Sequence, residues 1–405
     1  MKILLINNQH HRMGGAHAVY LSTAELLKKH GHGVFFFALK DEKMLSDEYA
    51  NYFPKAIDYR RLSTLSKIKS VRSFIYNKEA YTKLNEYIKF IKPDIAHIHL
   101  FMGGLTVSIL DAFKENNIPI VHTVHDYRLI CPAYLFFNGE NEICEKCRNN
   151  MYYQCIVNKC SENSLSQSTI LALDAYVRKW VKNPYKYIDS LIFVSNFALR
   201  KHLEFGLSQK IDSNVLYNFI PELSECKPNN KKGKYYLYFG RLSREKGIMT
   251  LLEAAKKTNI NLKILGTGPL QQIITSQKSN NIEILGYKKG NELIEIIKNA
   301  SFIIVPSEWY ENNPMSVIES YAYGKPVIGA DIGGIPEIVE HNKTGYLFES
   351  GNIDALAEQI EIADNLSDKE YEVMSKNARQ FADIHFNPEN YIIELIKIYN
   401  KIIYG

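Results

Sequence analysis

Short apolar runs of strand type alternate with helical stretches along the chain, and the alternation occurs twice. The first series consists of KILLIN (2–7), HGVFFFAL (32–39), DIAHIH (94–99), IPIVHTV (118–124) and SLIFVS (190–195). The second consists of KYYLYFG (234–240), NLKILG (261–266), IEILG (282–286), SFIIVPS (301–307) and KPVIGA (325–330). Strands that alternate with helices form parallel sheets covered by helices on both faces. We therefore predict an α/β fold with two doubly wound, Rossmann-like domains that face a central cleft.

The length of the chain agrees with two domains, because 405 residues exceed the usual size of one hydrophobic core. The basic, polar stretch CKPNNKKGK at 226–234 is the expected linker between the two halves. The end of the chain, NPENYIIELIKIYNKIIYG, has the pattern of an amphipathic helix with no strand after it. We expect this helix to pack on a domain that is already formed.

Composition is that of a soluble globular protein, with 46% hydrophobic and 23% charged residues. No apolar run reaches the roughly 18 residues that a membrane-spanning helix requires. The start, MKILLINN, is too short and too soon polar for a signal peptide. We expect a cytoplasmic protein without disulfides, and we find no signature of nucleic-acid binding.

The positive charge is concentrated in one segment. Between Asn51 and Lys92 there are ten Lys or Arg and three Asp or Glu. Such a segment can hold a protein on anionic phospholipid, which predicts peripheral association with the inner face of the cell membrane. A solvated helical face is the alternative interpretation.

Two glutamates lie eight positions apart in EWYENNPMSVIES, residues 308–320. Pro314 suits the first position of a helix, so Glu319 would fall in the second turn and Glu311 in the preceding loop. Eight helical positions span roughly 12 Å, whereas the two carboxyl groups of a glycosidase lie within about 5–9.5 Å of each other. We interpret the pair as holding the two ends of one long ligand. A stray loop glutamate and a solvated helix glutamate are the alternative.

The loops that follow the next strands carry cations and glycines. GRLSREKG places Arg241 and Lys246 at a strand-to-helix junction, where backbone N–H groups would help them to hold a diphosphate. Two solvated cations are the alternative. LGTGPL contributes Gly266 and Gly268, which would let the backbone approach a ligand closely.

Taken together, GRLSREKG, LGTGP, ENNPMSVIE and GGIPEIVEHNKTGYLF resemble the retaining glycosyltransferases of family 4, in order and spacing. The N-terminal Gly-Gly loop and HTVHDY extend the resemblance over most of the chain. It implies a GT-B fold with an acceptor-side domain at 1–215, a donor-binding domain at 216–385 and a helix at 386–405 that returns to the first domain.

The resemblance also implies roles for single residues. Arg241 and Lys246 match the pair that holds the donor diphosphate, Glu319 the glutamate on the ribose and Glu311 the glutamate that faces the donor sugar. His125 matches a histidine that reaches the sugar from the other domain. We expect the other residues that bind the donor to be Gly14, Gly15, Gly266, Gly268, Asn312, Asn313, Pro314 and Met315. Asn312 and Asn313 replace small residues, and we expect them to contact sugar hydroxyls. For His125 a satisfied core histidine is the alternative.

The implied reaction moves a sugar from a UDP- or GDP-sugar to a glycan or lipid-linked acceptor in the synthesis of surface polysaccharide or glycoconjugate. No second carboxylate is placed to act as nucleophile, which favours front-face attack with the leaving phosphate as base. No Asp-x-Asp motif is present, so we expect no cofactor for catalysis and neutralisation of the diphosphate by the two cations. One departure stands out: relatives read Pro-Asn-Gly at the domain junction, where this chain has Asn218 followed by Phe219.

Five of the six cysteines lie within thirty residues. Some relatives carry a similar cysteine-rich insertion, which corresponds here to residues 131–160 and implies a structural zinc site of Cys131, Cys144, Cys147 and Cys160. Cys155 would then be spare, and Cys226 lies apart. Reduced thiols packed without metal are the alternative.

Three other functions fit the sequence less well. A nicotinamide-dependent oxidoreductase would need a Gly-x-Gly-x-x-Gly loop, and Gly14-Gly15 does not supply one. A sugar-nucleotide epimerase would need an acid/base set around the sugar that we do not find. A sugar-binding module without activity is disfavoured because every expected site residue is present.

Overall fold

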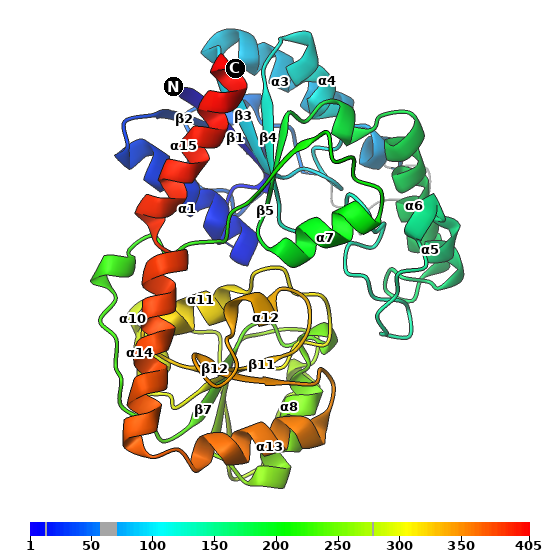
Figure 1. Cartoon of the computed structure of the whole chain (residues 1–405). Helices are drawn as coiled ribbons and strands as arrows, with labels where there is room; N and C mark the ends of the chain where they lie inside the picture. Colours follow the sequence, from blue (N-terminus) through cyan, green and yellow to red (C-terminus); the bar gives the residue numbers. More distant parts are fainter. Residues whose placement is uncertain (13, 57–70, 278) are drawn as a thin grey trace. The chain divides into compact units, whose positions relative to one another are not determined.

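The computed structural model describes residues 1–12, 14–56, 71–277 and 279–405. The chain forms two compact units, unit 1 of Met1–Leu216 with Ile392–Gly405 and unit 2 of Tyr217–Tyr391 (Figure 1). Each unit contains its own six-stranded sheet. The described strand pairs within both sheets are parallel, which confirms the wound α/β architecture.

The sheet of unit 1 has the order β2-β1-β3-β4-β5-β6. Its strands are β1 (Lys2–Gln9), β2 (Gly33–Leu39), β3 (Ile95–Leu100), β4 (Ile120–Val124), β5 (Ser190–Phe193) and β6 (Asp212–Val215). Its longer helices are α1 (Gly15–Lys29), α3 (Lys78–Ile91), α4 (Ser108–Glu115), α6 (Leu165–Trp180) and α7 (Asn196–Glu204). The side chains of β4 are all buried, as expected of a parallel strand covered on both faces.

The sheet of unit 2 has the order β12-β11-β10-β7-β8-β9. Its strands are β7 (Tyr236–Phe239), β8 (Leu262–Leu265), β9 (Ile282–Gly286), β10 (Ile303–Val305), β11 (Val327–Ala330) and β12 (Gly345–Phe348). Its helices are α8 (Ile248–Thr258), α9 (Gln271–Ser276), α10 (Gly290–Lys298), α11 (Met315–Ala322), α12 (Ile335–Ile338), α13 (Ile353–Asp364) and α14 (Asp368–His385). Two apolar clusters, one with Ile264 and Phe302 and the other with Ile303 and Ile318, form the core.

All ten predicted strands are present, but two further strands were missed. β6, with the sequence DSNV, and β12, with the sequence GYLF, lie at the outer ends of their sheets. The side chains of β6 are half-buried, so this strand has no need of an apolar run. Edge strands are therefore hard to recognise by hydrophobicity.

The predicted linker at 226–234 is wrong, because this segment packs on unit 2. Asn229 Nδ2 donates to the Lys298 carbonyl at 2.8 Å, and Lys232 Nζ donates to the Asp364 carbonyl at 2.8 Å. The division of the chain instead follows Leu216. Hydrogen bonds to carbonyls at helix ends fix the segment, although its composition is that of a solvated linker.

The predicted C-terminal helix is confirmed as α15 (Pro388–Tyr404). From Ile392 onward it belongs to unit 1, where the Tyr399 hydroxyl and His97 Nδ1 lie 2.6 Å apart. Among the described residues no helix is long and apolar enough to cross a membrane.

Candidate functional site

The order of the strands in unit 2 reverses between β7 and β10. β7 leads by residues 240–247 into α8, and β10 leads by residues 306–314 into α11. β7 and β10 are neighbours in the sheet, and β8 and β11 lie on their outer sides. Ligands of wound sheets bind beyond the carboxyl ends of the strands at such a reversal. Arg241, Lys246 and Glu311 lie in these two loops, and Glu319 lies in α11 directly after the second loop.

The reversal brings Lys246 and Glu311 together in an ion pair whose carboxylate is buried and whose ammonium is half-buried. Lys246 Nζ lies 2.6 Å from Glu311 Oε1, and the side chains are 26% and 7% exposed. The Ser307 hydroxyl donates to the same carboxylate oxygen at 2.7 Å. Lys246 Nζ also lies 4.9 Å from the centre of the Trp309 ring. The cation expected at the diphosphate and the carboxylate expected at the sugar therefore contact each other directly.

Arg241 is placed differently from Lys246. Its side chain is exposed, and its carbonyl accepts a hydrogen bond from the Tyr238 hydroxyl at 2.7 Å. Within the described ranges its guanidinium makes no ion pair. The structure thus brings one of the two predicted cations to a carboxylate and leaves the charge of the other unpaired. The latter is the arrangement that an incoming anion requires.

Glu319 lies in the second turn of α11, as predicted, and is half-buried. Burial raises the pKa of its carboxyl group to about 7. No hydrogen bond reaches this carboxylate from any of the residues that the structure describes. A partly buried carboxyl group without a partner is costly, so this position is suited to a ligand that donates hydrogen bonds.

Residues 312–315 join the loop to α11. Helix α11 begins at Met315, which is half-buried, and Pro314 is its N-cap rather than its first helical residue. Asn312 and Asn313 are buried. Asn313 Oδ1 accepts from the Asn218 N–H at 2.9 Å, and Asn218 Nδ2 donates to the Asn313 carbonyl at 3.1 Å. Asn313 therefore fixes the altered junction at Asn218, and this contact leaves only its Nδ2 for the sugar hydroxyls that we expected it to contact.

The predicted glycines bring loop backbones together. A Cβ on Gly266, whose φ is 134°, would lie 1.8 Å from the Gly240 carbonyl oxygen, and one on Gly268 would lie 2.3 Å from that of Leu242. The close approach that these glycines allow is thus to the loop after β7. Gly333 shows the same relation to the Glu311 backbone, to whose carbonyl the N–H of Gly334 donates at 2.7 Å.

In unit 1 the predicted residues lie at the carboxyl ends of β1 and β4. Gly14 is the N-cap of α1 and Gly15 its first residue; both are exposed, and a Cβ on Gly14 would meet no atom within 4 Å. His125 directly follows β4, and its Nε2 lies 2.8 Å from His99 Nδ1. Burial and the neighbouring His122 and His17 lower the pKa of His125 to about 3, so it is neutral at physiological pH.

The comparison with protein families covers both units. Residues 13–222 match the model described as Glycosyltransferase Family 4, and residues 219–381 match the model described as Glycosyl transferases group 1. The chain belongs to glycosyltransferase family 4. It is therefore a glycosyltransferase, as the resemblance of its motifs implied.

Relatives and solved structures agree with this family. An uncharacterised glycosyltransferase of Methanocaldococcus jannaschii is 27% identical, with 84% of this chain and 92% of the relative covered. A putative colanic acid biosynthesis glycosyltransferase of Escherichia coli is 27% identical over 37% of this chain and 40% of its own length. The crystal structure of Anabaena HepE in complex with UDP and glucose superposes with a TM-score of 0.69 at 16% identity, covering 99% of this chain and 100% of that one. This last likeness shows the GT-B fold.

Five of the six cysteines of this family member lie in unit 1, in the segment after HDYRLI, and Cys226 lies in unit 2. Burial and the nearby thiols of Cys131, Cys144 and Cys160 raise the pKa of Cys147. Burial raises the pKa of Cys131 to about 12. Within the described part of the chain no group of three or more His, Cys, Asp or Glu has a geometry that could hold a metal ion. The predicted zinc site stays a prediction.

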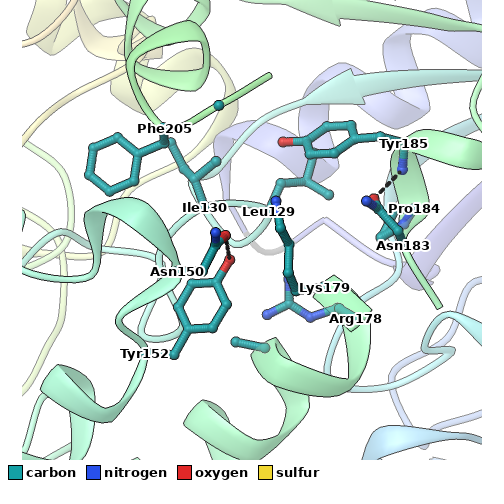
Figure 2. A pocket seen from close by; sticks show the side chains of 12 residues that line it. Leu129, Ile130, Asn150, Tyr152, Arg178, Lys179, Asn183, Pro184, Tyr185 and Phe205 are labelled. Atoms are coloured by element: carbon teal, nitrogen blue, oxygen red, sulfur yellow. Dashed lines mark hydrogen bonds between the residues drawn. The ribbon is translucent and has the colours of Figure 1, made fainter. Parts of the chain in front are cut away.

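A small cavity lies beneath α6 in unit 1, between Leu129, Tyr152, Arg178 and Tyr185 (Figure 2). Its volume of about 20 Å³ holds about one water molecule. The Tyr185 hydroxyl is buried without a partner among the described residues, which a water would satisfy. The cavity is too small for a sugar nucleotide and has no part in the candidate site.

Sequence reasoning missed the contacts of Ser307, Trp309 and His99, and it singled out Asn218 only as a departure from relatives. Trp309 and His99 meet residues of other loops and strands, and all three residue types are common in any loop or core. Only one signal pointed to them: Ser307 and Trp309 stand next to the ENNPMSVIE motif.

Proposed function

We propose that this family 4 glycosyltransferase transfers a sugar from a UDP- or GDP-sugar, with retention at the anomeric carbon, to a glycan or lipid-linked acceptor of surface polysaccharide synthesis. The observation that carries the proposal is the set of charges at the β7–β10 reversal. Arg241 and the carboxyl group of Glu319, both without a partner among the described residues, and the Lys246–Glu311 pair offer contacts for a diphosphate, a ribose and a sugar in one unit. HepE, solved with UDP and glucose, and the colanic acid relative support the donor class and the setting.

The side chains divide the donor between them. Arg241 and Lys246 hold the diphosphate, and Glu319 accepts from the ribose hydroxyls. Glu311 faces the sugar, and its carboxylate also accepts a hydrogen bond from the Lys246 ammonium. Of the residues in unit 1, Gly14 and Gly15 border the diphosphate and the acceptor, and neutral His125 contacts the donor sugar.

Calorimetry with free UDP and GDP tests this division. Glu319→Ala and Lys246→Ala each remove a charge-assisted contact worth about 1.5–3 kcal/mol, so nucleotide affinity falls roughly 10- to 150-fold. Glu311→Ala leaves nucleotide affinity close to that of wild type and lowers kcat, because its ligand is the sugar. Equal losses of nucleotide affinity in the Glu311 and Glu319 variants would refute the division.

Turnover assays decide the reaction itself. UDP-, GDP- and ADP-sugars are screened with wild type and with Arg241→Ala, and the anomeric configuration of the product is read by NMR. Retention without a carboxylate nucleophile supports front-face attack, with the departing phosphate as base and the two cations stabilising its charge. We expect activity to survive EDTA, since no metal is assigned to the chemistry. An inverted product would contradict the mechanism.

A structural zinc at Cys131, Cys144, Cys147 and Cys160 is a separate proposal. Four thiolates are a common tetrahedral zinc set, and the nearby Cys160 helps to raise the pKa of Cys131, Cys144 and Cys147. Metal analysis of the purified protein checks it: about one zinc per chain is expected, and a value near zero excludes the site.

We also propose that the enzyme works in the cytoplasm at the inner face of the cell membrane. Residues 57–70 of the basic segment at 51–92 on which this rests, with four of its ten cations, lie outside the described residues. Its described part includes Lys78 and Lys89 on α3, both of which are exposed. Flotation with anionic liposomes at low and high salt tests the association, and no binding at low salt would rule it out.

A further inference from the structure

A group of exposed apolar side chains lies on two neighbouring helices of unit 1. Seven of the 19 exposed large hydrophobic residues in the described part of the chain lie between Met151 and Val181, within α5 (Tyr153–Val157), α6 and their flanks. Scattered surface hydrophobics are ordinary, whereas a contiguous group marks an interaction surface.

Helix α6 exposes leucine and tryptophan while it buries charge. Trp180 is 71% exposed and Leu165 57%, but Asp174 and Arg178 are only 7% and 4% exposed. The two buried charges pair at 2.8 Å, and Arg178 Nη1 donates to the Arg128 carbonyl at 2.8 Å. The inner face of α6 is therefore fixed by a satisfied polar network, and the apolar face points away from the unit.

The exposed apolar residues of α6 and the half-buried Tyr176 form one stripe. Leu165, Leu173, Tyr176 and Trp180 recur at helical spacing and so lie on one side of the helix. The rings of Tyr176 and Trp180 stack with their centres 4.6 Å apart.

Helix α5 continues this stripe. The Tyr153 N–H donates to the Tyr176 hydroxyl at 3.1 Å, and the Tyr153 hydroxyl lies 3.9 Å from Met151 Sδ. Val157, one turn after Tyr153, is 68% exposed, while Cys155 between them is buried. We call the group of Met151, Tyr153, Val157, Leu165, Leu173 and Trp180 the α5–α6 surface.

The charges around the α5–α6 surface indicate what covers it. Lys159 and Lys179 lie between its residues in sequence, and Arg148 and Lys186 flank it. None of these four cations makes an ion pair with a described residue. Glu162 is the acidic residue of this stretch that is exposed. Lysine is depleted at protein–protein interfaces, whereas tryptophan, tyrosine and lysine together are typical of a lipid–water interface.

We propose that the α5–α6 surface docks on an anionic phospholipid membrane, with Trp180 and Leu173 entering the headgroup region and the four cations meeting lipid phosphates. The inference rests on the membrane association proposed above but not on sugar transfer. It assigns the contact to α5–α6 rather than to the 51–92 segment.

The test uses the full chain with vesicles of phosphatidylcholine alone and of phosphatidylcholine with phosphatidylglycerol. Wild type floats with the anionic vesicles, and Leu173→Ser/Trp180→Ser lowers the partition coefficient at least about tenfold, since each apolar side chain removed from the interface weakens partition. Val373→Ser, an equally exposed residue on α14 of unit 2, is the matched control and binds like wild type. Retained turnover of a water-soluble acceptor shows that the double variant is folded.

Tryptophan emission supplies a second readout, because the chain has only two tryptophans. When wild type binds vesicles, its tryptophan emission shifts to the blue and is quenched by brominated lipid. Trp180→Phe shows neither change. If wild type and the double variant bind vesicles equally, the α5–α6 surface is not the docking site, although the membrane association stands. The same conclusion follows if vesicle binding is lost only in Lys78→Glu/Lys89→Glu. No binding by wild type overturns the membrane association as well, and dimerisation abolished by Trp180→Ser would assign the surface to a second copy.

Discussion

Replacing Lys246 with methionine removes the ammonium from the Glu311 carboxylate and leaves an aliphatic chain of similar length. Glu311 is 7% exposed, and the Ser307 hydroxyl is then its remaining hydrogen-bond donor. Removing one partner of a buried pair costs about 3–5 kcal/mol. Lys246 is itself 26% exposed, so solvent screens part of the interaction. We therefore expect the low end of that range, about 3 kcal/mol.

Thermal unfolding measures this loss. In a unit of this length 1 kcal/mol corresponds to about 2–4 °C, so Lys246→Met lowers Tm by roughly 6–12 °C. A Trp180→Phe background leaves Trp309 as the one tryptophan, and its emission follows the unfolding of unit 2. Adding Glu311→Gln to Lys246→Met recovers most of the lost Tm, since no uncompensated charge is then buried.

The control is an exposed pair in the same unit. Lys257 Nζ lies 2.6 Å from Asp354 Oδ1, with side chains 54% and 81% exposed. Exposed pairs contribute about 0–1 kcal/mol, so Lys257→Met shifts Tm by little. The reasoning is refuted if Lys246→Met lowers Tm no more than Lys257→Met does. It is also refuted if Lys246→Met/Glu311→Gln unfolds at the same Tm as Lys246→Met.

Three other changes probe the two units. Burial raises the pKa of Glu319 from 4.5 to about 7. The folded protein therefore keeps this proton until the pH rises through 7, whereas the unfolded chain loses it near pH 4.5. Stability should fall by up to about 3 kcal/mol between pH 5 and 8, and urea titrations of Glu319→Gln should lack this fall. Burial lowers the pKa of His122 to about 4, so unit 1 should lose stability as pH falls from 6.5 to 4, and circular dichroism of His122→Asn should show a weaker dependence. A Cβ on Gly247, with φ 67°, would lie 1.7 Å from the Pro306 carbonyl oxygen, so Gly247→Ala should cost about 3 kcal/mol. Gly351→Ala, with φ 75° and no atom near, should cost about 1 kcal/mol in the same urea titration, and equal costs would contradict the clash.

The sequence predicted the central strands because parallel strands covered on both faces must be apolar throughout. Edge strand β6 escaped notice, since the half-buried Asp212–Val215 carries polar residues. The segment at 226–234 was mistaken for a linker because its polar side chains serve to bind helix-end carbonyls rather than water.

For the site, the sequence indicated residue types and their positions at strand ends. It could not indicate that Lys246 contacts Glu311, because the two are joined by the adjacency of β7 and β10, which are not consecutive in the chain. Asn313 likewise was expected to meet a ligand, but its side chain holds Asn218 across 95 positions. Contacts of this kind depend on strand order, which periodicity does not reveal.

The loops at the carboxyl edge of unit 2 rest on one another, backbone against backbone. Leu242 N–H donates to the Thr267 carbonyl at 3.0 Å, Glu308 N–H to the Glu245 carbonyl at 2.9 Å, and Gly334 N–H to the Glu311 carbonyl at 2.7 Å. In a chimera that receives one of these loops from a relative, the new loop must therefore fit the main chain of the neighbouring loops. Only then can its side chains contact the nucleotide-sugar. Exchange of donor preference between such enzymes then requires the four loops to be transplanted as a single block.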